Sequence, residues 1–152
     1  GVDDTVTDER ELPDKLSVLF VDDDCVLRKL FSRSLRRIAP EWNLTEASNG
    51  ETALRLVGSQ EFDLIFMDQY MASVEKQLLG SEATLALRAK GVSSLICGLS
   101  ANEARDTFIK AGADDFMIKP FPCEKVALTR ELLQILDSQK NATTVALDSP
   151  DS

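Results

Sequence analysis

Short apolar runs alternate with amphipathic stretches along most of this chain. Five runs have the length of strands, and they cover residues 16–21, 43–47, 62–67, 94–99 and 115–118. The first, third and fourth are apolar with almost no alternation, which is typical of strands buried on both faces in a parallel sheet. Helical patterns separate the runs at residues 25–38, after residue 50, at residues 81–89 and 102–111, and from residue 122 onward. This repeat predicts an α/β fold with a doubly wound, five-stranded parallel sheet between two layers of helices.

The helical pattern at residues 25–38 separates an apolar face from basic ones. Five apolar residues recur at helical spacing and are expected to face the sheet, namely Leu27, Leu30, Phe31, Leu35 and Ile38. Basic residues occupy the other faces, namely Arg28, Lys29, Arg33, Arg36 and Arg37. The last helical pattern carries a similar apolar stripe, which we also expect to be buried, made by Val126, Leu128, Leu132 and Ile135.

Length and composition indicate one globular domain. The chain has 152 residues, of which 43% are hydrophobic and 28% charged, as in ordinary globular proteins. We place the domain at residues 16–137, because the hydrophobic patterning is confined to them. Residues 1–15 form a polar, acidic lead-in and residues 138–152 a polar tail, and both are expected to be loosely ordered.

Charge and residue usage exclude several classes of function. A net charge of −9 argues against nucleic-acid binding by this chain and against contact with anionic membranes. The chain has no histidine, which excludes catalysis by its own histidines and histidine-ligated zinc. Cys25, Cys97 and Cys123 are widely spaced, which favours a reducing, cytoplasmic compartment, with Cys97 buried in its apolar run. No apolar run approaches the length of a transmembrane helix.

Polar side chains follow four of the five predicted strands. They are Asp22 and Asp23 after the first strand, Asp68 after the third, Ser100 after the fourth and Lys119 after the fifth. Because the carboxyl ends of parallel strands meet at one edge of a sheet, we expect these groups to lie together. Each aspartate or serine taken alone would serve equally well as a helix N-cap, and the lysine as a solvated surface residue. Taken together, they suit a single phosphoryl-transfer site.

The chemistry of such a site follows from the residue types. Clustered carboxylates repel one another, and a hard divalent cation such as Mg²⁺ relieves that repulsion. A further carboxylate can attack a phosphoryl group and become an acyl phosphate. A lysine ammonium and a serine hydroxyl can then neutralise or hydrogen-bond the phosphoryl oxygens.

Four motifs extend this pattern. They are Val-Asp-Asp-Asp at residues 21–24, Phe-Asp-Leu-Ile-Phe-Met-Asp at 62–68, Gly-Leu-Ser-Ala-Asn at 98–102, and Gly-Ala-Asp-Asp-Phe-Met-Ile-Lys-Pro-Phe at 112–121. In this order and spacing they resemble the motifs of response-regulator receiver domains of two-component and phosphorelay signalling. The resemblance covers about residues 16–137. It implies a flavodoxin-like (βα)5 fold, a three-layer sandwich.

The resemblance also implies roles for individual residues. Asp68 would accept a phosphoryl group from a phosphohistidine of a histidine kinase or a histidine-containing phosphotransfer protein. Mg²⁺ would be bound directly by Asp23 and Asp68, largely through water by Asp22, and by the backbone carbonyl of Tyr70. The protein would then be a self-phosphorylating and slowly self-dephosphorylating receiver rather than a turnover enzyme.

Further implied roles concern the phosphoryl oxygens and a conformational switch. Ser100 and Lys119 would hold the phosphoryl oxygens, and the Lys119-Pro120 peptide would be cis. On phosphorylation, Ser100 would move towards the phosphoryl group and Phe116 would rotate inward into the space vacated. The partner would dock on the helix at residues 25–38, where Arg28 and Lys29 are expected to contribute to recognition.

The sequence departs from the family pattern beside the acceptor. Met71 is followed by Ala72 instead of proline, and Gly80 comes about four residues late, which leaves an enlarged loop at residues 73–79. Phe116 stands where the family often has tyrosine. Neither departure removes a group that the chemistry requires.

Two other readings remain open at this stage. Residues 22–26 also fit the Asp-x-Asp signature of haloacid-dehalogenase-like phosphatases, in which Asp22 would be the nucleophile. That reading leaves Asp68 without a role. Alternatively, the chain is a docking module that is never phosphorylated, although all five residues of the acceptor site are present.

Overall fold

The computed structural model describes residues 11–71 and 78–148, and from residue 139 onward it describes the backbone only. The five strands of this part form one parallel sheet in the order β2-β1-β3-β4-β5. They are β1 (Ser17–Val21), β2 (Asn43–Ala47), β3 (Leu64–Asp68), β4 (Leu95–Ser100) and β5 (Asp115–Ile118). This order confirms the predicted doubly wound, flavodoxin-like sheet.

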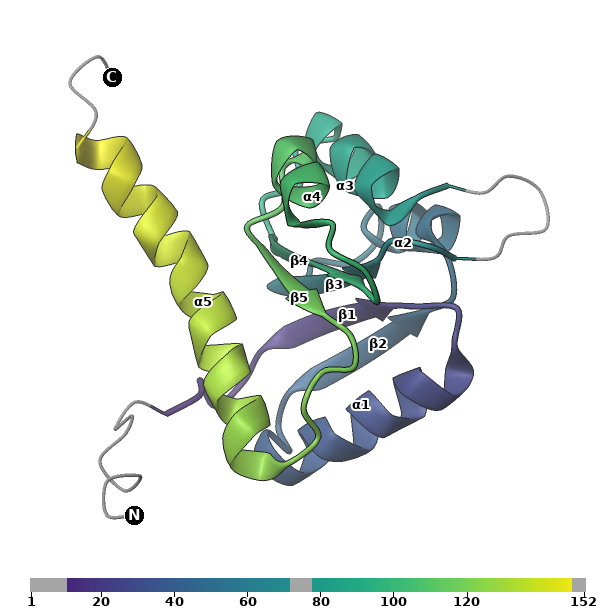
Figure 1. Cartoon of the computed structure of the whole chain (residues 1–152), viewed down its shortest axis with the longest axis vertical. Helices are drawn as coiled ribbons and strands as arrows, with labels where there is room; N and C mark the ends of the chain where they lie inside the picture. Colours follow the sequence, from purple (N-terminus) through teal and green to yellow (C-terminus); the bar gives the residue numbers. More distant parts are fainter. Residues whose placement is uncertain (1–10, 72–77, 149–152) are drawn as a thin grey trace.

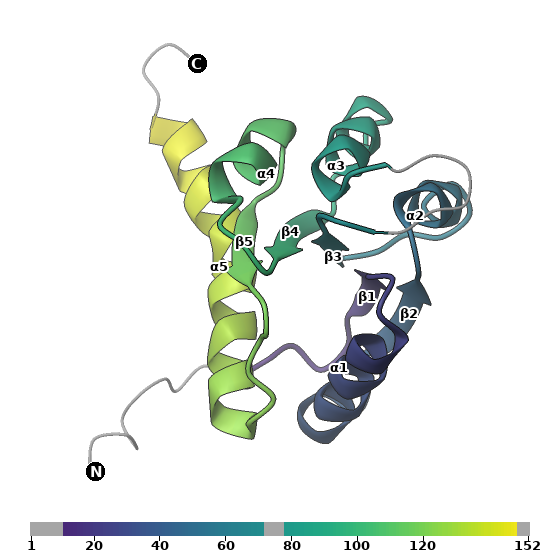
Figure 2. The same cartoon turned by 45° about the vertical axis from the view of Figure 1, so that its right-hand side comes forward.

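The helices of the described residues form two layers. They are α1 (Cys25–Ile38), α2 (Gly50–Leu56), α3 (Gly80–Ala89), α4 (Arg105–Ala111) and α5 (Lys125–Asp148). Helices α1 and α5 cover one face of the sheet, and α2, α3 and α4 cover the other (Figures 1 and 2). The result is the three-layer sandwich that the sequence predicts.

The central strand β1 shows how the unalternating apolar runs build this core. Val18 and Phe20 pack on the side of α1 and α5, whereas Leu19 and Val21 pack on the side of α2 and α3. All four are fully buried, and each contributes roughly 1.5–3 kcal/mol by the burial of its side chain. Both faces of β1 are therefore internal, as its composition predicts.

The starts of α4 and α5 lie later than the sequence predicts, at Arg105 and Lys125. Carboxylates placed just before each helix explain both positions. The Glu103 side chain accepts a hydrogen bond from the backbone N–H of Arg105 at 2.8 Å. The Glu124 side chain accepts from the N–H groups of the first turn of α5, beginning with Val126 at 3.1 Å. Each carboxylate satisfies backbone donors that would otherwise lack partners at the start of the helix.

Two residues assigned to buried helix faces are exposed instead. Leu30 is 40% exposed and Val126 is 57% exposed. Leu30 lies at the flank of the stripe that contains the buried Phe31 and Leu35. Val126 comes two residues before Leu128, a spacing that places it on the opposite side of α5. The helical stripes are thus narrower than their apolar composition indicates.

Parts of both predicted tails lie within the described residues. The Trp42 indole donates a hydrogen bond to the carbonyl of Pro13 at 2.8 Å, and Leu12 packs against the core. Leu12 and Pro13 of the predicted lead-in therefore contact the domain. Helix α5 continues to Asp148, past the predicted domain end at residue 137, because no glycine or proline interrupts it before Pro150. No described helix is both long enough and apolar enough to cross a membrane.

Candidate functional site

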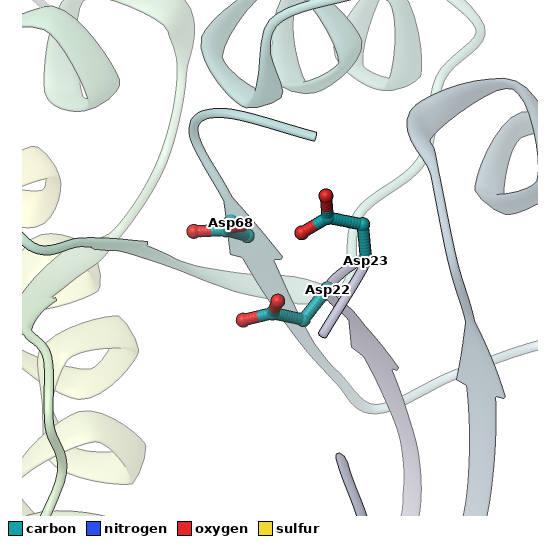
Figure 3. A group of neighbouring side chains, drawn as sticks. All are labelled: Asp22, Asp23 and Asp68. Carbon is teal, nitrogen blue, oxygen red and sulfur yellow. The ribbon is translucent and has the colours of Figure 1, made fainter. Parts of the chain in front are cut away.

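Three aspartates gather where the strand order of the sheet reverses. The chain crosses from one side of β1 to the other between β2 and β3, and ligands of doubly wound sheets bind at such a point, beyond the carboxyl ends of the strands. Asp22 and Asp23 follow β1 directly, and Asp68 is the last residue of β3. One carboxylate oxygen from each residue lies within 4.8 Å of the other two (Figure 3). The predicted cluster is therefore present.

Lys119 joins two of these carboxylates. Its ammonium donates to Oδ2 of Asp22 at 3.0 Å and lies 2.9 Å from Oδ1 of Asp68. The lysine follows β5, and Phe121 two residues later packs edge-on against Phe31 at 5.0 Å between ring centroids. The Lys119-Pro120 peptide between them is cis, as the resemblance implies. An aromatic anchor in the core thus holds the cationic residue at the site.

The electrostatics of Asp68 follow from this crowding. Burial raises the pKa of its carboxyl from 3.8 to about 6, and the negative charges of Asp22 and Asp23 act in the same direction. The hydrogen bond and charge of Lys119 oppose the rise. For Lys119 itself, burial lowers the pKa, but the bonds to Asp68 and Asp22 outweigh burial and leave the pKa raised. Lys119 therefore stays protonated, and the ionised form of Asp68 is costly.

Asp22 is fully buried, and its polar atoms are all hydrogen-bonded. Oδ1 accepts from the N–H of Asp24 at 2.9 Å, and Oδ2 accepts from Lys119. Its backbone N–H donates to the carbonyl of Ala47 at 3.0 Å, and its own carbonyl accepts from Arg28 at 2.6 Å. A carboxylate with all these hydrogen bonds is poorly placed to attack a substrate or to coordinate a metal directly.

The donor set fits a hard divalent cation. The site offers carboxylate oxygens, which Mg²⁺ prefers, and it offers them from Asp23 at the exposed rim and from Asp68 and Asp22 below it. Mg²⁺ keeps several water ligands, and such waters can bridge to the already bonded oxygens of Asp22. Tyr70 follows β3 with its side chain 64% exposed. The role of its carbonyl as a ligand stays a prediction.

Ser100 lies on the neighbouring strand. It ends β4, and the residue before it, Leu99, is paired in register with Asp68. The Ser100 side chain is buried, and its oxygen accepts a hydrogen bond from the N–H of Asn102 at 3.2 Å. A hydroxyl that accepts in this way keeps its proton for donation. The structure thus brings Ser100, Asp68 and Lys119 to one edge of the sheet.

Gln69 and Gly80 support the acceptor, and the motifs alone did not assign them these roles. The carbonyl of Gln69 accepts from the N–H of Gly80 at 2.9 Å, and its side-chain oxygen accepts from the N–H of Ser81 at 2.7 Å. These bonds cap α3, whose N-cap residue, Leu79, has no side-chain acceptor. A Cβ on Gly80 would lie 2.0 Å from the carbonyl oxygen of Asp68. In the sequence, Gly80 at the end of the enlarged loop was the signal that could have indicated this close approach. Residues 72–77 of the loop region lie outside the described part.

Phe116, the second predicted switch residue, is buried in this structure. Its side chain is 5% exposed, and its ring lies 5.9 Å from the ring of Phe108. The Arg105 guanidinium lies 5.9 Å from the same ring and donates to the carbonyl of Phe116 at 3.2 Å. Phe116 is thus in the inward position in this structure, and the link between this position and phosphorylation stays a prediction. A phenylalanine has no hydroxyl to draw it towards water, so burial against Phe108 is favoured.

Comparisons with known proteins agree with this geometry. The sequence model of the response regulator receiver domain matches residues 18–140. The chain belongs to this family. The two-component response regulator ORR41 of rice is 34% identical over 118 residues, covering 74% of this chain and 90% of that protein. The sensor protein EvgS of Escherichia coli O157:H7 is 35% identical over 112 residues, covering 72% of this chain but only 9% of its own length.

Solved structures share the receiver fold. The receiver domain of the sensor histidine kinase PA1611 from Pseudomonas aeruginosa was solved with a magnesium ion coordinated in its active site cleft. It is 29% identical to this receiver, with a TM-score of 0.65, and the match covers 81% of this chain and 95% of that one. The chemotaxis response regulator CheY4 of Vibrio cholerae matches with a TM-score of 0.68 at 24% identity, covering 80% and 98% of the two chains.

Proposed function

We propose that this receiver takes a phosphoryl group from a phosphohistidine partner onto Asp68, in a reaction that depends on Mg²⁺, and thereby switches or relays a signal. The observation that carries the proposal is the contact of Lys119 with both Asp68 and Asp22, within a cluster of three carboxylates. A cation held against a buried acceptor stabilises the charge that develops on phosphoryl transfer. The magnesium-bound receiver of PA1611 supports the choice of metal.

The proposed transfer requires the ionised form of Asp68. One of its carboxylate oxygens attacks the phosphorus, a P–O bond forms, and the P–N bond to the partner's imidazole breaks. The electron pair of that bond returns to the imidazole, and Asp68 is left as an acyl phosphate. Lys119 neutralises one phosphoryl oxygen and the Ser100 hydroxyl donates to another. Bound Mg²⁺ would screen the carboxylates of Asp22 and Asp23 from the incoming phosphoryl charge.

Each receiver would accept one phosphoryl group and lose it slowly by hydrolysis, so it is not a turnover enzyme. The donor histidine must lie outside these 152 residues, since they contain none. A histidine kinase or a histidine-containing phosphotransfer protein in the cytoplasm would fill this role. The net charge of −9 argues against nucleic acid as a partner of this chain.

Helix α1 is the proposed docking surface for the donor. Val26 and Leu30 on its first turns are exposed, and Lys29 and Arg33 are exposed beside them. An apolar surface with basic neighbours fits a partner surface that is apolar at its centre and acidic at its rim. Arg28, which the sequence also assigned to docking, instead turns inward to the carbonyl of Asp22.

Labelling with a small phosphodonor such as acetyl phosphate tests the proposal. Asp68→Asn should abolish the incorporation of phosphate in the presence of Mg²⁺, whereas Asp22→Asn should slow it. The buried, fully bonded Asp22 carboxylate argues against the phosphatase reading, but loss of labelling in Asp22→Asn alone would support it. A folded wild-type protein that is never labelled would instead be a docking module.

A further inference from the structure

We propose that Arg28 is a positioning residue. It holds the acidic turn after β1, residues 22–24, in the geometry that binds Mg²⁺. The inference rests on the proposed function, because it concerns the same metal site. Arg28 belongs to α1 and contacts neither the acceptor Asp68 nor Lys119 in any described hydrogen bond. Its effect would pass through the backbone of Asp22.

The guanidinium of Arg28 makes two directed contacts. Nη1 donates to the carbonyl oxygen of Asp22 at 2.6 Å, and Nε donates to Oε1 of Glu46 on β2 at 3.0 Å. The Arg28 side chain is 18% exposed, so it is largely withdrawn from solvent. A hydrogen bond from a charged donor is stronger than a neutral one, and the planar guanidinium fixes both directions at once. Arg28 therefore ties α1, the acidic turn and β2 together.

The bonded carbonyl is the one that orients Asp23. The carbonyl of Asp22 and the N–H of Asp23 belong to one planar peptide unit, so fixing the first fixes the second. Asp23 follows this peptide and has an exposed side chain at the rim of the acidic cluster. The N–H of Asp22 already donates to Ala47, and Oδ1 of Asp22 accepts from Asp24. Neither of these two bonds restrains the rotation of the Asp22–Asp23 peptide. The bond from Arg28 to the carbonyl of Asp22 does.

A purely electrostatic role and a positioning role of Arg28 predict opposite changes in Mg²⁺ affinity when the residue is removed. A positive charge near a site for a divalent cation repels that cation, so its removal would strengthen Mg²⁺ binding if charge alone mattered. If Arg28 positions the turn, its removal weakens binding despite the relief of repulsion. The sign of the change therefore separates the two roles.

The experiment is calorimetric titration of the wild-type protein and variants with Mg²⁺ alone, at neutral pH and moderate salt. Arg28→Ala should weaken Mg²⁺ binding roughly tenfold, the lower end of the range for residues that orient metal ligands. Arg28→Lys keeps the charge but not the two-directional contact, and it should lose nearly as much. Arg37→Ala removes the same charge from an exposed position of α1 and should bind Mg²⁺ as the wild type does, or slightly more tightly.

Two further measurements keep a structural effect apart from a positioning effect. Thermal unfolding without metal reports any loss of stability, and a merely structural role would lower the melting temperature while the folded protein kept its affinity. If Arg28→Ala does not fold, Arg28→Met replaces it, because the long side chain can keep its packing but makes neither hydrogen bond. That variant should also weaken Mg²⁺ binding roughly tenfold.

The outcomes separate the positioning role of Arg28 from the proposed function. If Arg28→Ala, or Arg28→Met in its place, binds Mg²⁺ as tightly as the wild type or more tightly, the positioning role is overturned and the proposed function is left intact. A wild-type protein that binds no Mg²⁺ overturns both. If the wild type binds Mg²⁺, Arg28→Ala and Arg28→Lys bind it more weakly and Arg37→Ala binds it normally, the result supports the assignment of Arg28.

Discussion

The ammonium of Lys119 lies 2.9 Å from the carboxylate of Asp68, across the ends of β3 and β5. The two residues reach each other only because their strands flank β4 in the parallel sheet. Burial makes the ionised form of Asp68 costly, and Lys119 is the nearest described group that lowers this cost. The pair thus keeps the acceptor reactive inside a largely buried site.

Replacing Lys119 by alanine should therefore slow phosphorylation. The pKa of Asp68 would rise further without the ammonium, and the developing phosphoryl charge would lose its donor. We expect labelling by a small phosphodonor at pH 7 to slow on the order of 100-fold, as when one charge-stabilising donor is removed from an enzyme. The initial rate of phosphate incorporation measures this. Lys90→Ala, at an exposed position beyond α3, is the matched control and should be labelled at the wild-type rate.

Stability should depend on pH through Asp68. Its pKa is about 6 in the folded protein against 3.8 for an unperturbed aspartate, so the folded state holds the proton more tightly. Between these values the folded state binds more protons than the unfolded state, and the free energy of unfolding falls as pH rises. The contribution is fully present below about pH 4 and is lost above about pH 6. Its size is on the order of 3 kcal/mol.

Urea unfolding of wild type and Asp68→Asn without metal, from pH 4 to pH 7, checks this dependence. The variant cannot ionise at this position, so its stability advantage over the wild type should grow through that range. Mg²⁺ should restore wild-type stability near pH 7, since it offsets the repulsion among the carboxylates. A constant difference between the two proteins at all pH values would contradict the raised pKa.

Gly80→Ala should disturb the acceptor itself. The new Cβ would meet the backbone carbonyl of Asp68 at 2.0 Å, and backbone atoms cannot rotate away as a side chain can. We expect a loss of about 1–3 kcal/mol of stability and slower labelling of the folded fraction. Gly58→Ala is the control, because its Cβ would lie 3.3 Å from the carbonyl of Arg55 and far from the acidic cluster in sequence and fold. Urea unfolding and labelling of both variants measure the two effects.

The sequence predicts the site well because parallel strands deliver their ends to one edge. Unalternating apolar runs locate β1, β3 and β4, and the polar residue after each run must then lie near the others. No knowledge of side-chain conformation is needed for this step. The distances confirm it for Asp22, Asp68 and Lys119.

Side-chain direction and helix extent could not be predicted in this way. Arg28 lies on the basic side of α1 in the pattern, yet its long side chain folds back to the carbonyl of Asp22. Phe116 is buried because Phe108 lies beside it, and Phe108 fits there because Gly98 has no Cβ, which would lie 2.3 Å from the Phe108 ring. Such contacts join residues from different elements, and no local pattern encodes them.

Recognition of the donor should depend on Lys29 but not through the chemistry at Asp68. Lys29 is exposed on α1, so Lys29→Glu should slow transfer from a phosphohistidine protein several-fold and leave labelling by a small phosphodonor unchanged. Arg28→Glu should slow both reactions, because it also disturbs the turn that carries Asp22. Stopped-flow transfer from the cognate donor and labelling with acetyl phosphate separate the two. Equal slowing of both reactions in Lys29→Glu would argue against docking at this position.

The last prediction concerns Phe116. Its ring is buried beside Phe108, and the Arg105 side chain donates a hydrogen bond to its backbone carbonyl. We therefore expect nuclear Overhauser contacts between the Phe116 and Phe108 rings both before and after addition of beryllofluoride, a mimic of the phosphoryl group. Ser100, by contrast, should move, because its hydroxyl gains an acceptor at Asp68.

Two variants sharpen this test. Phe116→Ala should cost about 3–5 kcal/mol of stability, as expected when a buried phenylalanine is truncated. Ser100→Ala should keep the contacts between the two rings, because the described contacts of Phe116 are made with Phe108 and Arg105 and not with the serine hydroxyl. If the ring contacts appear only with the mimic, Phe116 starts outside and the rotation is the response to phosphorylation. If they persist throughout, phosphorylation of Asp68 must act through another element of the fold. Helix α3 is the best-placed candidate, since Gly80 lies against the carbonyl of Asp68.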